Sequence, residues 1–323
     1  VNKDSGVKPP APKKDSGGQP PAPKKDSGVQ PPAPKKDSSV KPPTPKKDSS
    51  VQPPAPKQDT GPQPPFPLAT HYMVAAVQYS SGGAGQVKAS CLKNAQPNVC
   101  ALSHMIGVAA GAGARFVVLP EYAFGKDQKY YEAPPKLGVN PGTDPTWPAG
   151  LLTKYFSKQA AKYKVYLVIN LLTFTGAKPS TKYHNTNLAF TPGGSVAAVH
   201  HKFNLFGDEP KYLTPGNSVV AFGTPLGPMG LLVCADIYGD PWLLSQLSGS
   251  KKARLVAFTS YWTSSGAVNW QADYAKKYGV YLIAANTVSS PGQGGGVYGP
   301  QGQTLVQAIK GTPSVLVATI PVN

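Results

Sequence analysis

An eleven-residue repeat rich in proline and lysine opens the chain and limits what its first 68 residues can fold into. Copies such as KDSGVKPPAPK and KDSGVQPPAPK follow one another from Lys3 to Lys57, and a degenerate sixth copy ends at Leu68. A period of eleven can indicate a helical supercoil, but the prolines in every copy are incompatible with a helix interior. The PPxP core instead favours polyproline II, with the K-D-S-G segment as a flexible hinge.

Residues 1–68 hold almost no aliphatic or aromatic side chains to bury, so we predict that this segment is disordered. At roughly 3.1 Å per residue it reaches about 200 Å in the extended limit. It can act as a spacer, as an anchor to a wall or matrix, or as a scaffold for proline-binding partners, and the spacer is the default interpretation. Residues 69–323, where apolar runs and turn signals alternate, are predicted to form one domain with a substantial core.

The formal net charge of +17 is divided between the two parts of the chain. Residues 1–68 hold twelve Lys against six Asp, a net +6, and the rest holds 20 Lys and Arg against nine Asp and Glu, a net +11. A basic surface favours a polyanionic matrix or cell-wall partner, although solubility alone explains it as well. The lysines of the repeat have no interleaved aromatic residues for base stacking, which argues against sequence-specific nucleic-acid binding.

The three cysteines and the start of the chain bear on the compartment of the protein. Cys91 and Cys100 can form a local disulfide in an oxidising compartment, although two reduced thiols near a helix start fit equally well. Cys234 is then left unpaired. The chain begins at Val1 rather than Met, which favours a processed extracellular protein, although a fragment boundary gives the same start. No apolar run reaches the ~18–20 residues of a transmembrane helix, the longest being 165–174.

Strands and helices alternate through the globular part, which predicts an α/β fold whose sheets are covered by helices. Residues 115–124, RFVVLPEYAF, form a continuous apolar run typical of a strand buried on both faces. Residues 184–206 predict a hairpin, since two alternating strands flank a Pro-Gly-Gly turn. The other expected strands are 71–80, 165–174, 228–234, 253–261, 280–288, 303–309 and 313–321, and the expected helices are 98–114, 147–163, 241–250 and 266–278.

Four of the expected strands end in polar side chains that can do chemistry. These are Glu121 after FVVLP, Lys202 after VAAVHH, Cys234 after GLLV, and the pair Tyr261-Trp262 after LVAFTS. Ligand sites of α/β enzymes gather at the carboxyl ends of strands, so we expect these side chains to converge. A carboxylate, an ammonium and a thiol supply a base, an anion stabiliser and a nucleophile. Taken singly, each has a simpler explanation: core packing for the Cys, a helix cap for the Glu and a solvated charge for the Lys.

The order and context of these motifs match a known enzyme superfamily. LPEYAFG, HHKFNLFGDEP and LLVCADIYGDP resemble the segments around the Glu, Lys and Cys of the nitrilase, or carbon–nitrogen hydrolase, superfamily. The resemblance runs from about Tyr72 to Val322, and the vanin and biotinidase amidases look most similar, also through GGGVYGP at 294–300. The resemblance implies a four-layer α-β-β-α nitrilase-like sandwich that hydrolyses amides.

The resemblance also implies a role for each residue of the predicted site. Cys234 is the nucleophile, Glu121 is first a general base and then a general acid, and Lys202 stabilises the tetrahedral oxyanion. Glu209 matches the second glutamate of the family, which helps to position the reacting groups. The backbone N–H of Ala235 would complete the oxyanion hole.

Physical chemistry adds expectations about pKa values, cofactors and the substrate pocket. The ammonium of Lys202 should lower the pKa of Cys234 from ~8.5 toward neutrality. Burial should raise the pKa of Glu121 toward the operating range. The five His residues are scattered, with no Cys/His cluster of the kind that binds zinc, so we expect neither a metal nor an organic cofactor. The aromatic residues expected to bind substrate are Tyr261, Trp262 and Tyr298.

The sequence thus predicts a secreted amidase that cleaves a linear amide of a small carboxylic acid through a cysteine thioester. The alternative is a structural or matrix protein in which the nitrilase-like domain is catalytically idle and the Pro/Lys repeat carries the function. The joint presence of Glu121, Lys202 and Cys234 favours the enzyme, because a scaffold has no use for all three. Homo-oligomerisation, which many relatives show, is a further expectation.

Overall fold

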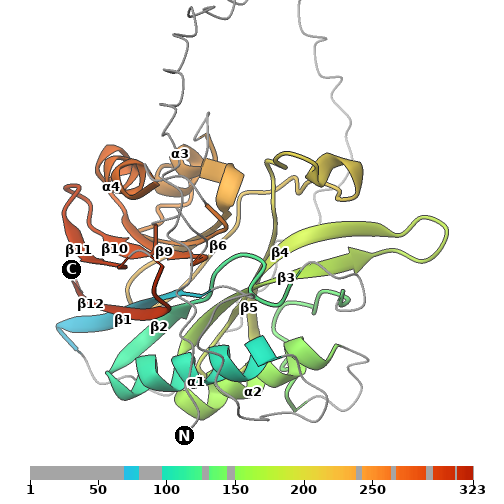
Figure 1. Ribbon diagram of the computed structural model, residues 1–323, viewed down its shortest axis with the longest axis horizontal. Helices are drawn as coiled ribbons and strands as arrows, with labels where there is room; N and C mark the ends of the chain where they lie inside the picture. The colour runs from blue at the N-terminus through green and yellow to red at the C-terminus, as the bar shows by residue number, and fades with distance from the viewer. Residues whose placement is uncertain are drawn as a thin grey trace, which may run out of the picture. The chain divides into compact units, whose positions relative to one another are not determined.

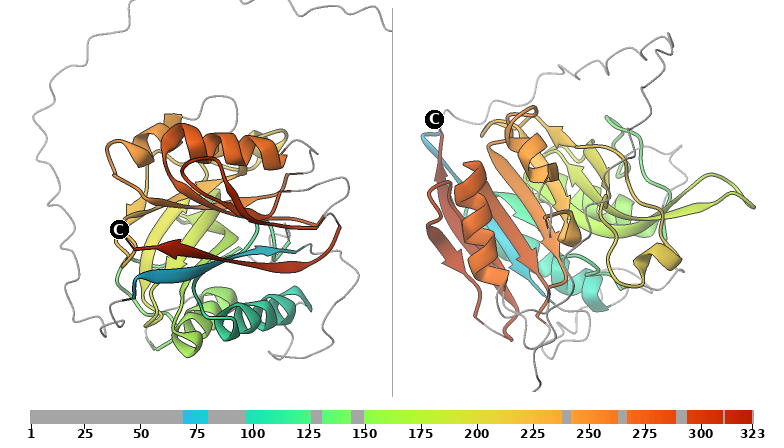
Figure 2. Two further views of the ribbon diagram at one scale, coloured as in Figure 1. Left: turned by 90° about the vertical axis from the view of Figure 1, so that its left-hand side faces the viewer. Right: turned by 90° about the horizontal axis from the view of Figure 1, so that it is seen from above.

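Two stacked β-sheets with helices on both outer faces form the folded part of the chain (Figure 1, Figure 2). The computed structural model describes residues 69–79, 97–125, 131–143, 150–237, 242–262, 267–288, 294–309 and 311–322. The repeat lies outside these residues, so its disorder and the domain boundary at residue 69 stay predictions. The layers follow the order helix, sheet, sheet, helix, which confirms the expected α-β-β-α sandwich.

The first sheet joins the beginning and the end of the described fold. Three parallel strands lie next to one another in it: β1 (His71–Gln78), β2 (Ala114–Val118) and β3 (Tyr166–Thr175). On one side β3 is followed by the antiparallel strands β4 (Lys182–Phe190) and β5 (Val196–His201). On the other side β12 (Ser314–Pro321) pairs antiparallel with the whole length of β1.

The second sheet carries the predicted nucleophile on its parallel part. Its parallel strands are β7 (Met229–Val233), β8 (Leu255–Ser260) and β9 (Tyr281–Asn286). Antiparallel strands flank them: β6 (Ala221–Phe222) next to β7, then β10 (Gly296–Tyr298) and β11 (Thr304–Gln307) beyond β9. The sequence analysis missed β6 and β10 because two or three residues are too short to show a period.

The helices are separated between the two outer faces. α1 (Pro97–Gly111) and α2 (Leu151–Tyr163) cover the first sheet, and α3 (Trp242–Ser248) and α4 (Ala267–Tyr278) cover the second (Figure 2). Within the described ranges, no helix is long and apolar enough to span a membrane.

Apolar side chains from both sheets fill the space between them. Phe116 stacks on Tyr166 with ring centroids 5.0 Å apart in the first sheet, and Leu231 and Ile283 face them from the second sheet as part of the same buried cluster. Each such side chain contributes about 1.5–3 kcal/mol when it is fully buried. The packed sheets therefore hold the strand ends of both sheets in fixed relative positions.

The predicted strand over 115–124 is wrong in its second half. β2 ends at Val118, and the residues that follow leave the sheet. Pro120 has no N–H and cannot continue a ladder of hydrogen bonds. Tyr122 then adopts a left-handed backbone conformation with φ of 55°. These two residues turn the chain so that Glu121 lies off the end of the strand rather than within the sheet.

One buried carboxylate serves the fold rather than the site. Glu132 accepts hydrogen bonds from the backbone N–H groups of Leu152, at 2.6 Å, and Thr153, at 2.9 Å, at the start of α2. A negative charge is favourable at this end of a helix. Gly150 leaves room for it, because a Cβ there would lie 1.7 Å from the Glu132 Cδ.

The cysteines fall into two classes. Cys100 in α1 is disulfide-bonded, whereas Cys234 is a free thiol. Cys91, the predicted partner of Cys100, lies outside the described residues, so this pairing stays a prediction.

Candidate active site

The structure brings together residues from all four of the predicted strand ends. Glu121 follows β2 and Lys202 follows β5 in the first sheet, while Cys234 follows β7 and Tyr261 follows β8 in the second. The charges of Glu121 and Lys202 both act on the Cys234 thiol, and the Tyr261 backbone N–H donates a hydrogen bond to its sulfur. The site is therefore built where strands of the two sheets end side by side.

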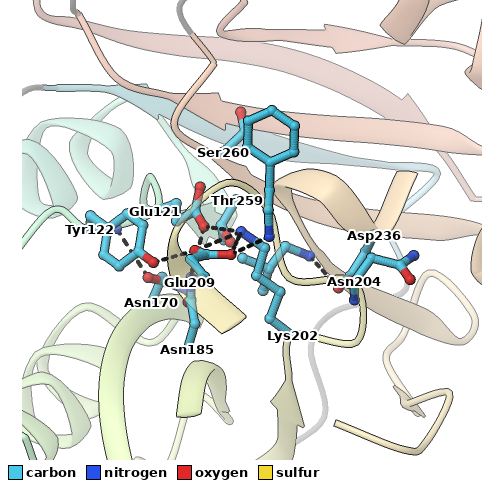
Figure 3. Close-up of polar contacts among 12 residues, drawn as sticks. Glu121, Tyr122, Asn170, Asn185, Lys202, Asn204, Glu209, Asp236, Thr259 and Ser260 are labelled. Carbon is cyan, nitrogen blue, oxygen red and sulfur yellow. Dashed lines mark hydrogen bonds and ion pairs between the residues drawn. The ribbon is translucent and has the colours of Figure 1, made fainter. Parts of the chain in front are cut away.

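Lys202 is buried between two carboxylates (Figure 3). Its Nζ lies 2.9 Å from Glu121 Oε1 and 2.9 Å from Glu209 Oε2, and only 2% of its side chain is exposed. A buried charge is costly unless it is paired, so the two carboxylates are what keeps this lysine in the interior. An ammonium has three N–H donors. Both oxygens of Glu209 lie 2.9 Å from Nζ, so the carboxylates of Glu121 and Glu209 together surround the ammonium.

The two oxygens of Glu121 have different surroundings. Oε1 accepts hydrogen bonds from Lys202 Nζ at 2.9 Å and from Asn185 Nδ2 at 2.7 Å. Oε2 is buried and has no hydrogen-bond partner among the described residues. The Cys234 thiol lies close enough to Glu121 for the charge of this carboxylate to raise the pKa of the thiol. Oε2 is therefore available as a base.

Burial is the largest influence on the pKa of each charged group in the cluster. Burial raises the pKa of Glu121, and the charge of Glu209 acts in the same direction. The charge and hydrogen bond of Lys202 and the hydrogen bond from the Asn185 amide oppose this rise without cancelling it. Burial acts to lower the pKa of Lys202, but the charges of Glu121, Cys234 and Glu209 outweigh it, so the pKa is raised. For Glu209, burial acts upward, yet the Lys202 charge and hydrogen bonds bring the pKa below its usual value. Glu121 is therefore the carboxylate that takes up a proton most readily.

Cys234 lies one residue beyond β7, at the start of the short 3-10 helix η3, and has a φ of 43° that side chains rarely adopt. Burial, then the charge of Glu121, raises the pKa of the thiol, and the Lys202 charge and the Tyr261 N–H oppose this without reversing it. The prediction that Lys202 lowers the pKa of Cys234 toward neutrality is therefore wrong, because burial and a carboxylate together exceed one ammonium. The resting thiol keeps its proton and needs a base when it attacks.

Glu209 is held from several sides, as its predicted positioning role requires. It lies in the 3-10 helix η2 (Glu209–Lys211), and the backbone N–H of Phe206 donates to its Oε2 at 2.8 Å. The Tyr122 hydroxyl donates a short hydrogen bond to its Oε1. The ring of Tyr122 in turn packs edge-on against Tyr261, with centroids 6.1 Å apart. Tyr122 was not predicted as a site residue, although it directly follows Glu121 in the sequence.

Asp236 ties the segment after Lys202 to the turn at Cys234. Its Oδ1 accepts the backbone N–H groups of Phe203 and Asn204, both at 2.8 Å (Figure 3). Its Oδ2 accepts the Val233 N–H at 2.9 Å and His200 Nε2 at 2.8 Å. A carboxylate only accepts, so Nε2 carries the proton of the His200 ring. The sequence analysis assigned no role to Asp236 and missed this position between the two loops.

The predicted substrate-binding aromatics separate into one exposed and two buried residues. Tyr261 is 37% exposed, whereas Trp262 is buried against the rings of Phe258 and Trp270, and Tyr298 has no exposed surface. Successive residues along an extended chain point to opposite faces, which accounts for the different environments of Tyr261 and Trp262. The substrate-binding role of these three residues stays a prediction. The role of the Ala235 backbone N–H, next to Cys234 in η3, stays a prediction.

Three asparagines below the carboxylates form a part of the site that the sequence did not reveal. Asn170 on β3 and Asn185 and Asn187 on β4 have no exposed surface. They lie in the middle of strands, where a polar residue in the sequence usually indicates a solvent-facing position. Only the position of the second sheet over these strands shows that they are buried.

The adjacent histidines His200 and His201 bind different partners. His200 Nε2 contacts Asp236, and His201 Nδ1 contacts Thr186 Oγ1 at 2.8 Å. Among the residues that the structure describes, no group of three His, Cys, Asp or Glu side chains could hold a metal ion.

The family match covers the whole cluster. The family model for carbon-nitrogen hydrolases matches residues 73–323, which include Glu121, Lys202, Glu209 and Cys234. The chain belongs to the carbon-nitrogen hydrolase family. This membership agrees with the sandwich of two sheets and with the resemblance of the three sequence motifs.

Individual relatives of this chain include a biotinidase and a pantetheine hydrolase. The chain is 27% identical to Takifugu rubripes biotinidase over 263 residues, covering 72% of this chain and 52% of that protein. It is 29% identical to a human pantetheine hydrolase over 231 residues, covering 64% and 44%. The chain thus spans about half the length of the curated relatives it matches.

A solved structure shares the fold over nearly its full length. An amidase from Nesterenkonia sp. superposes with a TM-score of 0.61 at 21% identity, covering 78% of this chain and 91% of the amidase. In a variant of that amidase, the acetamide moiety of fluoroacetamide is covalently added at the active-site cysteine.

Proposed function

We propose that this carbon-nitrogen hydrolase is an extracellular amidase that cleaves a linear amide of a small carboxylic acid through a thioester at Cys234, with the Pro/Lys repeat as spacer or anchor. One observation carries the proposal: Glu121, paired to Lys202 at 2.9 Å, acts on a buried free thiol, and its Oε2 has no hydrogen-bond partner among the described residues. An unsatisfied buried polar atom costs about 1–3 kcal/mol, which a purely structural domain has no reason to retain. The similarity to biotinidase and pantetheine hydrolase favours substrates of their kind and an extracellular location.

The first step forms a bond from sulfur to carbon. Glu121 Oε2 takes the proton of the Cys234 thiol while Sγ attacks the amide carbonyl carbon, and the carbonyl electrons move onto oxygen. The ammonium of Lys202, together with the Ala235 backbone N–H, would stabilise this oxyanion. The raised pKa of Cys234 makes proton removal by Glu121 necessary for attack, since the resting cysteine is a thiol.

The second and third steps return the enzyme to its starting state. Collapse of the tetrahedral intermediate breaks the C–N bond, protonated Glu121 gives its proton to the leaving nitrogen, and the acyl group stays on Sγ as a thioester. Ionised Glu121 then removes a proton from water, whose oxygen attacks the thioester carbon. The C–S bond breaks, the proton goes to sulfur, and the products are one amine and one carboxylic acid for each amide and water consumed.

We expect activity to fall on acidification and not on moderate alkalinisation. The base form of Glu121 is lost as the pH falls through its raised pKa, so the acid limb of kcat/KM should lie above the ordinary range of a glutamate. The pKa of Lys202 is also raised, so its charge persists at alkaline pH. A profile of kcat/KM from pH 4 to 10 measures this. An acid limb at or below about 4.3, the value of a free glutamate side chain, would contradict the role of Glu121.

Intact-protein mass spectrometry tests the proposal directly. The protein is incubated with a panel of amides that includes pantetheine and biotinyl-lysine, beside the Cys234→Ala variant. We expect an acyl adduct that forms on the wild type, disappears with time and is absent from the variant. The mass of the adduct identifies the acyl group, and its decay rate should match product release.

Two results would count against the amidase. An adduct that also forms on Cys234→Ala would place acylation on another residue. The absence of both adduct and turnover across the panel, while iodoacetamide still alkylates Cys234, would favour a catalytically idle nitrilase-fold protein whose repeat carries the function.

A further inference from the structure

A closed series of hydrogen bonds fixes the carboxylate of Glu121 (Figure 3). Asn185 Nδ2 donates to Glu121 Oε1 at 2.7 Å, and Asn170 Nδ2 donates to Asn185 Oδ1 at 2.7 Å. The backbone N–H of Tyr122 donates to Asn170 Oδ1 at 3.0 Å. Tyr122 directly follows Glu121, so the series begins and ends on neighbouring residues. The backbone and the carboxylate at this position are thus held by one set of bonds.

The Tyr122 N–H determines the orientation of both amides. A backbone N–H only donates, so Asn170 must turn its oxygen toward Tyr122 and its NH₂ toward Asn185. Asn185 must then turn its oxygen toward Asn170 and its NH₂ toward Glu121. The network therefore always presents an N–H donor to Oε1.

The backbone of Asn185 places this amide opposite Lys202. The Lys202 N–H donates to the Asn185 carbonyl at 2.7 Å, one position beyond the pair Thr186 and His201 of the β4–β5 ladder. Opposed residues of antiparallel strands project their side chains from the same face. Asn185 and Lys202 therefore approach Oε1 together, and Oε2 is the oxygen that remains.

We infer that Asn185 is a positioning residue that holds Glu121 by Oε1, so that Oε2 takes the proton of Cys234. The inference rests on the proposed function for the purpose of this proton transfer, but the transfer itself can be followed without an amide substrate. Asn185 also favours the ionised form of Glu121, because its amide hydrogen bond acts to lower the pKa of the carboxyl. Removing the donor should therefore make Glu121 a base only at higher pH.

Alkylation of Cys234 by iodoacetamide, followed by intact mass across pH, measures the proton transfer alone. In the wild type the rate should fall on acidification as Glu121 becomes protonated. In Asn185→Leu, which keeps the volume but removes the donor, the acid limb should move upward by about one pH unit or more, since a hydrogen bond to a charged group is lost. With an amide substrate, kcat should fall while KM changes little.

Asn187→Leu is the matched control. Asn187 lies two residues along β4 and is equally buried. Its Nδ2 donates to the Leu232 carbonyl at 3.0 Å, and its Oδ1 accepts from Thr259 at 2.9 Å and from Asn170 Nδ2 at 3.0 Å, so it contacts the series at Asn170 but gives no hydrogen bond to Glu121. This variant should unfold at a lower temperature than the wild type, but its alkylation rate should fall on acidification over the same pH range as that of the wild type.

Two further variants cover the case in which Asn185→Leu does not fold. Asn185→Asp keeps the size and the acceptor for Asn170 but replaces the donor by a second carboxylate, so a larger upward shift is expected. Asn170→Ser removes the bond that orients Asn185 and the acceptor of the Tyr122 N–H, but no direct contact with the carboxylate, and should give a smaller shift in the same direction. An unchanged limb in the folded variants, or an equal shift in Asn187→Leu, overturns the inference. If the alkylation rate of Cys234 depends on pH as expected but no amide is turned over, only the amidase proposal is contradicted.

Discussion

Lys202→Met should remove turnover and destabilise the fold at the same time. Loss of an oxyanion donor costs about 10²–10³ in kcat, and here the same substitution also removes the counter-ion of Glu121 and Glu209. Deleting one partner of a buried ion pair costs about 3–5 kcal/mol because the remaining charge is uncompensated. A fall in Tm of about 10 °C is expected for a domain of this size. Amide hydrolysis and thermal unfolding of the wild type and the variant measure both effects.

The loss of stability in Lys202→Met should depend on pH in a defined direction. Without the ammonium, the folded-state pKa values of Glu121 and Glu209 rise above their unfolded values, so the folded variant binds more protons than the unfolded chain. Its stability relative to the wild type is then greatest at acid pH and decreases as the pH rises through these pKa values. Thermal unfolding at pH 5 and at pH 8 should show the smaller difference at pH 5.

A double variant separates the two roles of Lys202. Lys202→Met combined with Glu209→Gln removes one of the two unpaired charges, so part of the stability should return while turnover stays absent. Recovery of turnover would show that Lys202 acts only by balancing charge. A Lys202→Met protein as stable as the wild type at pH 8 would contradict the ion pairing of the buried cluster.

The sequence located the reacting groups because they follow apolar strands. Glu121, Lys202 and Cys234 each come directly after a strand core, and strand ends of packed sheets gather in space. This position is readable from hydrophobic periodicity and turn residues alone. The same reasoning overextended the strand before Glu121, since the apolar character of residues 119–124 continues although Pro120 and the turn at Tyr122 end the ladder.

The supporting groups could not be read in the same way. Asn185 carries no signal in the sequence, because its importance depends on its alignment with Lys202 and on its burial under the second sheet. The sign of the pKa shift of Cys234 was also beyond the sequence. The sign follows from the combined effects of burial, the Glu121 charge and the Lys202 charge on the Cys234 thiol. A motif that reveals only a nearby ammonium suggests the opposite sign.

Asp236→Ala should be among the most destabilising substitutions in the domain, at about 4 kcal/mol or more. It leaves three backbone N–H groups and the His200 ring N–H without their acceptor, and each buried unsatisfied donor costs about 1–3 kcal/mol before the structure relaxes. Urea denaturation measures the loss. His200→Ala is the matched control, since it removes a single one of these four hydrogen bonds and should cost clearly less.

Asp236→Asn distinguishes shape from acceptor capacity. The amide can keep its oxygen toward Phe203 and Asn204, but its NH₂ then faces the Val233 N–H, so one donor opposes another at the residue before Cys234. We expect about half the loss of stability seen with Asp236→Ala, and a fall in kcat that exceeds the change in KM, because the turn at Cys234 is no longer tied to the segment after Lys202. If Asp236→Asn matches the wild type in kcat, the carboxylate stabilises the fold without aligning the nucleophile. If His200→Ala is as damaging as Asp236→Ala, the backbone hydrogen bonds contribute nothing measurable, and the join between the two loops rests on the imidazole alone.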